Sequence, residues 1–113
     1  MARFLFEASY TVEGVAGLRR QGGSGRREAV ALAALSVGGA LEQFYFTFGH
    51  YDAVAVVDLP DNQSAAAFAL AVGEAGGARV RTVVLVTPEE IDAAAQQAVE
   101  YQSPMEWEEP RHF

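Results

Sequence analysis

The sequence of 113 residues contains neither cysteine nor lysine. Because there is no cysteine, disulfides, thiolate metal sites and cysteine nucleophiles are excluded from every interpretation of the chain. Because there is no lysine, the eight arginines are the only side chains with a permanent positive charge. A guanidinium group suits bidentate contacts with anions, so each arginine is a candidate anion ligand.

Long apolar stretches are also missing, since no stretch reaches the roughly 18 uncharged apolar residues of a membrane-spanning helix. The net charge of −7 argues against binding to nucleic-acid backbones, which requires clustered cations. With His50 and His112 as the only histidines, a metal site has little support. We therefore expect a cytoplasmic protein that binds neither membranes nor nucleic acids and carries no metal or cofactor.

Apolar residues recur with the period of a strand in four segments and with the period of a helix elsewhere. The predicted strands cover residues 3–10, 41–48, 53–59 and 79–86. The predicted helices cover residues 11–20, about 25–37, 61–75 and 87–98. Ser24 is the expected N-cap of the second helix, and Thr87 with Glu90 forms the expected capping box of the last.

This order predicts an α+β fold of the ferredoxin-like type, βαββαβ, with an extra C-terminal helix. The short polar turn between the second and third strands predicts a hairpin in an antiparallel four-stranded sheet. We also expect the first and third strands, and the second and fourth, to run parallel across the helical crossovers. Helices then cover one face of the sheet.

The other face of the sheet is expected to carry Leu5, Glu7, Ser9, Gln43, Tyr45 and Thr47. This mixed apolar patch is larger than soluble monomers usually expose. A second copy of the chain would cover it, since two-fold homodimers are the commonest oligomers. The alternative cover is the chain's own C-terminus.

We divide the chain into a domain of residues 1–98 and an acidic C-terminal tail of residues 99–113. The tail contains Trp107 and Phe113, which are costly to expose to water. We expect it to dock on the body of the domain or on a partner subunit.

The turn at residues 49–52 holds the densest group of reactive side chains, His50, Tyr51 and Asp52. One interpretation is an acid–base site, because imidazole titrates near neutral pH and a carboxylate or phenol can orient it. The other is a structural turn in which Gly49 supplies the backbone angle and Asp52 accepts hydrogen bonds from turn amides. Both interpretations stay open.

A second candidate site is the glycine-rich segment 22–25 followed by Arg26 and Arg27. A helix N-terminus with Ser24 and two guanidinium groups suits a phosphate or carboxylate. The segment lacks the Lys-Ser/Thr of a P-loop, so nucleotide binding by that route is not indicated. The alternative is a capped helix start whose arginines pair with acidic side chains.

Two strand residues complete the candidate ligand-binding set of Ser24, Arg26, Arg27, Tyr45 and Asp58. Tyr45 is expected on the open face near Glu7, where a pocket between subunits would lie. Asp58 is either a loop cap or a carboxylate whose pKa burial would raise. Tyr10 aligns with the phenylalanine face of its strand, so core packing is expected for it.

Seven short motifs resemble the GYD-domain family of small bacterial proteins, which is related in fold to the dimeric α/β-barrel group. They are Tyr10-Thr11, Gly22-Gly23-Ser24 with Arg26-Arg27, Gly38-Gly39, Phe44-Tyr45-Phe46, Gly49 with Tyr51-Asp52, Asp58-Leu59-Pro60-Asp61 and Thr87-Pro88-Glu89-Glu90. The resemblance covers nearly the whole chain. It implies a ferredoxin-like fold with a dimeric α/β-barrel type of assembly, and no established activity.

Three functions stay open. The favoured one is a homo-oligomeric binding module for a small anionic or aromatic metabolite, based on the arginine-flanked glycine segment and the aromatic sheet. The second is a cofactor-independent enzyme of the isomerase, decarboxylase or oxygenase type, with its site at the 49–52 turn. The third is a structural or protein-interaction subunit without a pocket.

Overall fold

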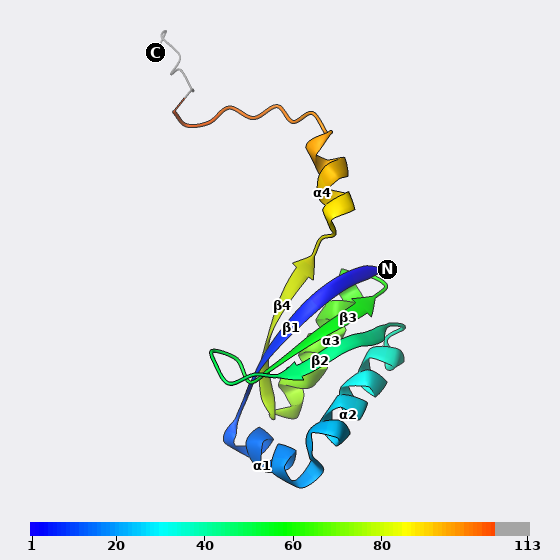
Figure 1. The fold of residues 1–113 in the computed structure, drawn as a ribbon, viewed down its shortest axis with the longest axis vertical. Coiled ribbons are helices and arrows are strands. Elements are labelled where there is room, and N and C mark those ends of the chain that lie inside the picture. The colour runs from blue at the N-terminus through cyan, green and yellow to red at the C-terminus, as the bar shows by residue number, and fades with distance from the viewer. Residues whose placement is uncertain (106–113) are drawn as a thin grey trace.

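The computed structural model of the chain describes residues 1–105. A four-stranded sheet carries helices on one face, and a last helix stands beyond the end of the sheet (Figure 1). The elements are β1 (Ala2–Tyr10), α1 (Val12–Gln21), α2 (Gly23–Ser36), β2 (Ala40–Phe46), β3 (Ala53–Leu59), α3 (Asn62–Ala75), β4 (Ala78–Leu85) and α4 (Pro88–Ala95).

The strand order in the sheet is β2-β3-β1-β4, and every neighbouring pair is antiparallel. This order and the element sequence confirm the predicted ferredoxin-like fold. The expectation that the first and third strands run parallel is wrong, because β1 and β3 are antiparallel neighbours in the centre of the sheet. Each helical crossover spans one intervening strand, so it is β1 and β2 that share a direction, as β3 and β4 do.

The hydrophobic core lies between the sheet and helices α2 and α3. The alternation of β1 turns Phe4 and Phe6 toward these helices, where 1% and 3% of each residue stays exposed. Phe6 packs on Phe68 of α3, with 4.7 Å between the ring centroids. From β3, Val57 and Leu59 complete the layer with no exposed surface.

A single glycine separates α1 from α2. Gly22 has a φ of 82°, a left-handed conformation that favours glycine, and it ends one helix and begins the next. The second helix therefore starts at Gly23, earlier than the predicted residue 25. The predicted N-cap role of Ser24 is wrong, because Ser24 lies inside the first turn and the helix has no side-chain cap.

The hairpin between β2 and β3 is longer than predicted. β2 ends at Phe46, and the loop closes when the Thr47 amide donates to the Asp52 carbonyl at 2.8 Å. Phe48 lies in the loop with its side chain fully exposed, so it does not share the strand face of Phe44 and Phe46 as expected.

The open face of the sheet is the one that α2 and α3 leave uncovered. Strand register places the residues of this face in rows across all four strands. The two central rows are Tyr45–Val54–Glu7–Arg81 and Gln43–Val56–Leu5–Val83. The face is therefore largely apolar in these rows, with Glu7 on the inner strand β1 and Arg81 at the β4 edge. It carries the predicted residues Leu5, Glu7, Ser9, Gln43 and Tyr45, whereas Thr47 lies beyond the end of β2 in the hairpin loop.

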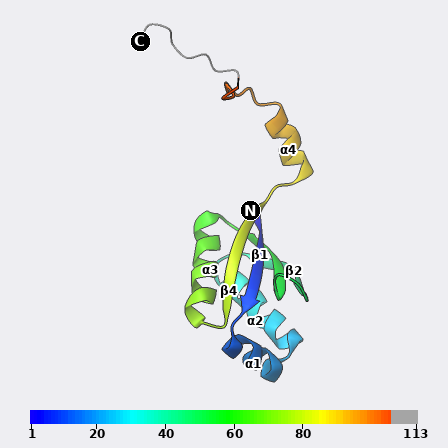
Figure 2. The same ribbon diagram turned by 90° about the vertical axis from the view of Figure 1, so that its left-hand side faces the viewer.

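Helix α4 and residues 96–105 project away from the sheet (Figures 1 and 2). The helix begins with the predicted capping box, in which Thr87 and Glu90 exchange hydrogen bonds, and it ends at Ala95, short of the predicted residue 98. The predicted docking of the tail stays a prediction. Trp107 and Phe113 lie outside the described residues.

Candidate functional site

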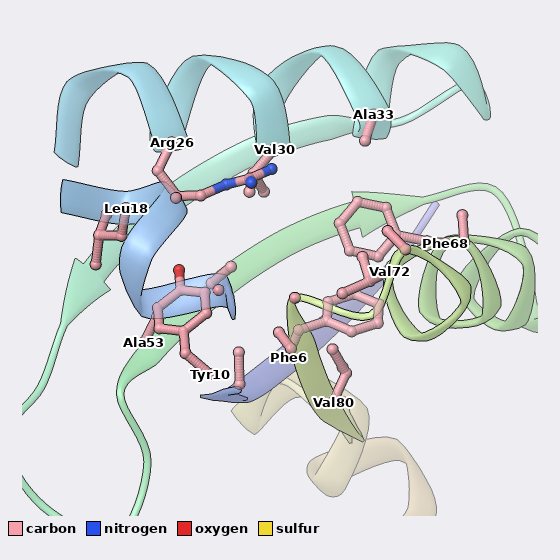
Figure 3. A pocket seen from close by; sticks show the side chains of 18 of the residues that line it. Phe6, Tyr10, Leu18, Arg26, Val30, Ala33, Ala53, Phe68, Val72 and Val80 are labelled. Carbon is pink, nitrogen blue, oxygen red and sulfur yellow. The ribbon is translucent and has the colours of Figure 1, made fainter. Parts of the chain in front are cut away.

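A cavity of about 690 Å³ lies on the helix side of the sheet. It is bounded by β1 and β3 below and by α1, α2 and α3 above and beside it (Figure 3). Its apolar wall consists of Phe6, Leu18, Val30, Phe68, Val72 and Val80. Cavities of this size and character accommodate small organic ligands.

Small side chains on the surrounding helices keep this space open. Ala67, Ala71 and Ala75 line the cavity from α3, and their spacing of four places them on one side of that helix. Gly14 and Gly17 line it from α1. Larger residues at Ala67, Ala71, Ala75 and Gly17 would reduce this volume, whereas a side chain at Gly14 would collide with the backbone of Gly77.

Polar side chains enter the cavity beside this apolar wall. Arg26 extends from α2 over the space, and Tyr10 rises from the end of β1 with its hydroxyl group directed into it (Figure 3). Glu13 and Arg20 of α1 also line the cavity. In residues 1–105, no carboxylate lies within ion-pair distance of the Arg26 guanidinium. Arg26 is therefore a positive charge available to a ligand.

Burial raises the pKa of the Tyr10 phenol, the positive charge of Arg26 partly offsets this, and the negative charge of Asp52 adds to the increase. The phenol therefore stays protonated near neutral pH and can donate a hydrogen bond. Core packing was expected for Tyr10. Its ring does share the phenylalanine face, but Tyr10 is only partly buried and its hydroxyl is directed into the cavity (Figure 3).

The predicted ligand-binding residues do not form one group. Arg26 lines the helix-side cavity, whereas Ser24, Arg27 and Tyr45 line a separate, smaller groove beside β2. Tyr45 lies on the open face, as expected, with 60% of the residue exposed. The adjacent arginines thus serve different surfaces, because successive residues of a helix point in directions about 100° apart.

Asp58 is paired with Arg3 directly opposite on β1. The Arg3 Nε atom donates to Asp58 Oδ1 at 2.8 Å, and a second nitrogen donates to Oδ2 at 3.2 Å. This hydrogen bonding lowers the pKa of the Asp58 carboxyl group, outweighing the opposite effect of burial. Asp58 is therefore a cross-strand ion-pair partner on the open face.

The lowered pKa of Asp58 predicts a loss of stability in acid. A carboxyl group whose pKa falls on folding stabilises the folded state at every pH above its ordinary pKa of 3.8. That contribution disappears as the pH falls below this value and through the folded pKa. We expect the free energy of unfolding to decline less between about pH 5 and about pH 2 in Asp58→Asn than in the unmodified protein. Urea unfolding across this range measures it, and identical declines would contradict the assignment.

The 49–52 turn is held by structural contacts. The Asp52 carboxylate accepts a hydrogen bond from the Tyr10 amide at 2.8 Å, and the Tyr51 hydroxyl accepts one from Arg81 at 3.3 Å. The Thr47 hydroxyl donates to the Tyr51 carbonyl. His50 is exposed and packs edge-on against Tyr51, with 4.8 Å between the ring centroids. None of His50, Tyr51 and Asp52 lines the helix-side cavity.

The model of the GYD domain family matches residues 4–95. The chain belongs to the GYD-domain family. The match spans all the strands and helices α1 to α4 of this GYD domain. Comparison with curated proteins and with solved structures gave no match.

Two further features of the GYD domain bear on its ligands. Within residues 1–105, no three His, Asp or Glu side chains gather closely enough to hold a metal ion. In the same residues, no helix has the length and apolar character needed to span a membrane. The side chains that line the cavity are mostly aromatic and aliphatic, with the guanidinium groups of Arg20 and Arg26 and the carboxylate of Glu13 among them.

Proposed function

We propose that this GYD domain is a homo-oligomeric binding module for a small metabolite that combines an aromatic or other apolar body with an anionic group. The observation that carries the proposal is the Arg26 guanidinium beside an apolar cavity of about 690 Å³. A ligand anion would pair with Arg26, and its apolar body would contact Phe6 and Phe68. The Tyr10 hydroxyl would donate a hydrogen bond to an oxygen of the ligand.

The balance of charges in the cavity favours a ligand with a single anionic group. Glu13 lines the same cavity as Arg20 and Arg26. A carboxylate among the lining groups offsets part of their positive charge, so a strongly charged anion such as a polyphosphate is disfavoured. A carboxylate, sulfonate or enolate attached to an aromatic ring matches the lining.

Self-association is part of the proposal. The open face exposes Tyr45 beside the half-buried residues Val54, Val56 and Leu5. Covering these side chains with a second copy removes apolar surface from water and is the simplest two-fold arrangement. The cavity lies on the opposite face of the sheet, so a second copy on the open face leaves the ligand cavity free.

A pair of fluorescent probes tests the cavity. The anionic probe is 8-anilinonaphthalene-1-sulfonate, and N-phenyl-1-naphthylamine is its neutral counterpart. We expect both to bind, and we expect Arg26→Gln to weaken binding of the sulfonate by about tenfold, the value of a hydrogen bond to a charged group. Binding of the neutral probe should stay unchanged. Fluorescence titration measures both dissociation constants.

Arg27→Gln is the matched control, since Arg27 is the neighbouring arginine and does not line the cavity. It removes the same charge from the same helix, so any general electrostatic effect appears in both variants. Equal weakening of the sulfonate by the two substitutions would contradict the role of Arg26. Failure of both probes to bind the unmodified protein would contradict the binding function.

A further inference from the structure

Helix α4 packs against no other element in residues 1–105. All eight of its residues are exposed, and the chain measures 69 Å along its longest axis against 29 and 24 Å across it. Both ribbon views show α4 and the segment after it clear of the sheet and of the other helices (Figures 1 and 2). We name residues 88–105 the C-terminal arm.

A helix this short needs a partner to be stable. Isolated helices shorter than about 12–15 residues are marginal in water, and helices in proteins gain most of their stability from packing an apolar face. The sequence nevertheless contains strong start signals for α4, a complete capping box and a proline in the first turn. In a single chain the arm leaves Ile91, Val99 and Tyr101 exposed by 57%, 77% and 75%. These exposed side chains are the apolar surface that α4 and the segment after it can pack against a partner.

Charge is divided unevenly between the arm and the rest of the chain. The arm contains four acidic residues and no basic one, a net charge of −4. Residues 1–87 contain seven arginines and eight acidic residues, a net charge of only −1. The arm is thus the acidic part of a chain whose body is nearly neutral.

The open face offers a surface that matches the arm. Leu5, Val54 and Val56 form an apolar area on its inner strands beside Glu7, and Arg79 and Arg81 of β4 lie along its margin. In the part of the chain that the structure describes, Arg79 has no carboxylate within ion-pair distance, and Arg81 has only Glu7, at 4.0 Å. Acidic residues of an arm can therefore pair with these guanidinium groups while Ile91 packs beside them.

We propose that the C-terminal arm docks on a second copy of the chain, along the β4 margin of its open face. Two copies related by a two-fold axis would then exchange arms, each giving one and receiving one. This inference rests on the proposed self-association and adds to it the segment that joins the copies. It is independent of the ligand cavity.

Photo-crosslinking tests the exchange of arms directly. Because the chain has no cysteine of its own, a single introduced thiol can be labelled selectively. Gln96→Cys introduces a single thiol at the exposed end of α4, which is modified with a benzophenone maleimide. The modified chain is mixed with an equal amount of unmodified ¹⁵N-labelled chain and irradiated. We expect adducts between light and heavy chains, with the crosslink in peptides of β1 or β4. Adducts confined to one chain would overturn the proposal.

A pair of substitutions measures what the arm contributes. Ile91→Asp places a charge on α4, and Leu70→Asp does the same on the outer side of α3, where Leu70 is 73% exposed. We expect Ile91→Asp to raise the dimer dissociation constant by about tenfold or more, and Leu70→Asp to leave it unchanged. Light scattering over a dilution series gives both constants.

The outcomes separate this inference from the proposed assembly. A chain that stays monomeric at every concentration overturns both the self-association and the exchange of arms. A dimer that is insensitive to Ile91→Asp, and that yields no adduct between chains, overturns the exchange alone. Ligand binding by a dimer of either kind would be unaffected, because the cavity belongs to a single chain.

Discussion

Replacing Ala71 by tryptophan is expected to abolish binding of both naphthalene probes while the GYD domain stays folded. Ala71 lines the cavity from α3 and its side chain is exposed, so an indole ring can enter the cavity without displacing the core. The ring would occupy the space that the ligand's apolar body needs. We expect the dissociation constants of both probes to rise by about 100-fold or more, since most of the apolar contact is lost.

Ala66→Trp is the control for this substitution. Ala66 is an exposed alanine of the same helix and does not line the cavity. Equal tryptophan content keeps the intrinsic fluorescence of the two variants comparable. Unchanged probe binding in Ala71→Trp, with an intact circular dichroism spectrum, would show that the probes bind elsewhere.

The second large effect is expected from Phe4→Ala. Only 1% of Phe4 is exposed, and it lies in the central strand β1 with Val57 opposite on β3 and Val84 opposite on β4. Removing a fully buried phenylalanine side chain costs about 3–5 kcal/mol, because transfer energy is lost and a cavity remains. That cost is a large part of the stability of a domain of this size.

Phe48→Ala is the same chemical change at a fully exposed position, where the side chain contributes no buried area. We expect its free energy of unfolding to stay within about 0.5 kcal/mol of the unmodified protein. Urea unfolding at one fixed protein concentration measures both variants, since self-association would make the midpoint depend on concentration. Similar losses in the two variants would contradict the assigned core.

Most of the fold was predictable because local signals agree along the chain. The alternation of Phe4 and Phe6 fixed β1 and its buried face, and the polar residues after β2 fixed the hairpin. Thr87, Pro88 and Glu90 fixed the start of α4. The relative directions of β1 and β3, and of β2 and β4, were predicted wrongly, because they depend on how many strands a crossover spans and no local pattern records that.

The boundary errors have local physical causes. Strand β2 was extended to Phe48 because phenylalanine at every second position favours a strand. The hydrogen bond from the Thr47 amide to Asp52 closes the loop one residue after β2 ends. Ser24 was a plausible cap, but Gly22 with its positive φ precedes the helix, which therefore starts at Gly23, before Ser24. Both outcomes depend on backbone geometry that residue types alone did not determine.

The candidate site was the least predictable part. A pocket was expected where subunits meet on the open face, whereas the cavity of about 690 Å³ lies under the helices of a single chain. Of the predicted ligand-binding residues, Arg26 alone lines it. The alanines spaced by four in α3 were a signal in the sequence, since small side chains along one side of a helix leave the space beside it unfilled.

One contact links the two surfaces that sequence analysis treated separately. The Tyr10 side chain borders the cavity, while its backbone amide is held by the Asp52 carboxylate in the hairpin loop. If a ligand displaces Tyr10, the hydrogen bond between its amide and Asp52 would transmit the displacement to the loop that carries His50. A ligand in the cavity would then change the position of groups in the hairpin loop, the exposed imidazole of His50 and the phenol of Tyr51.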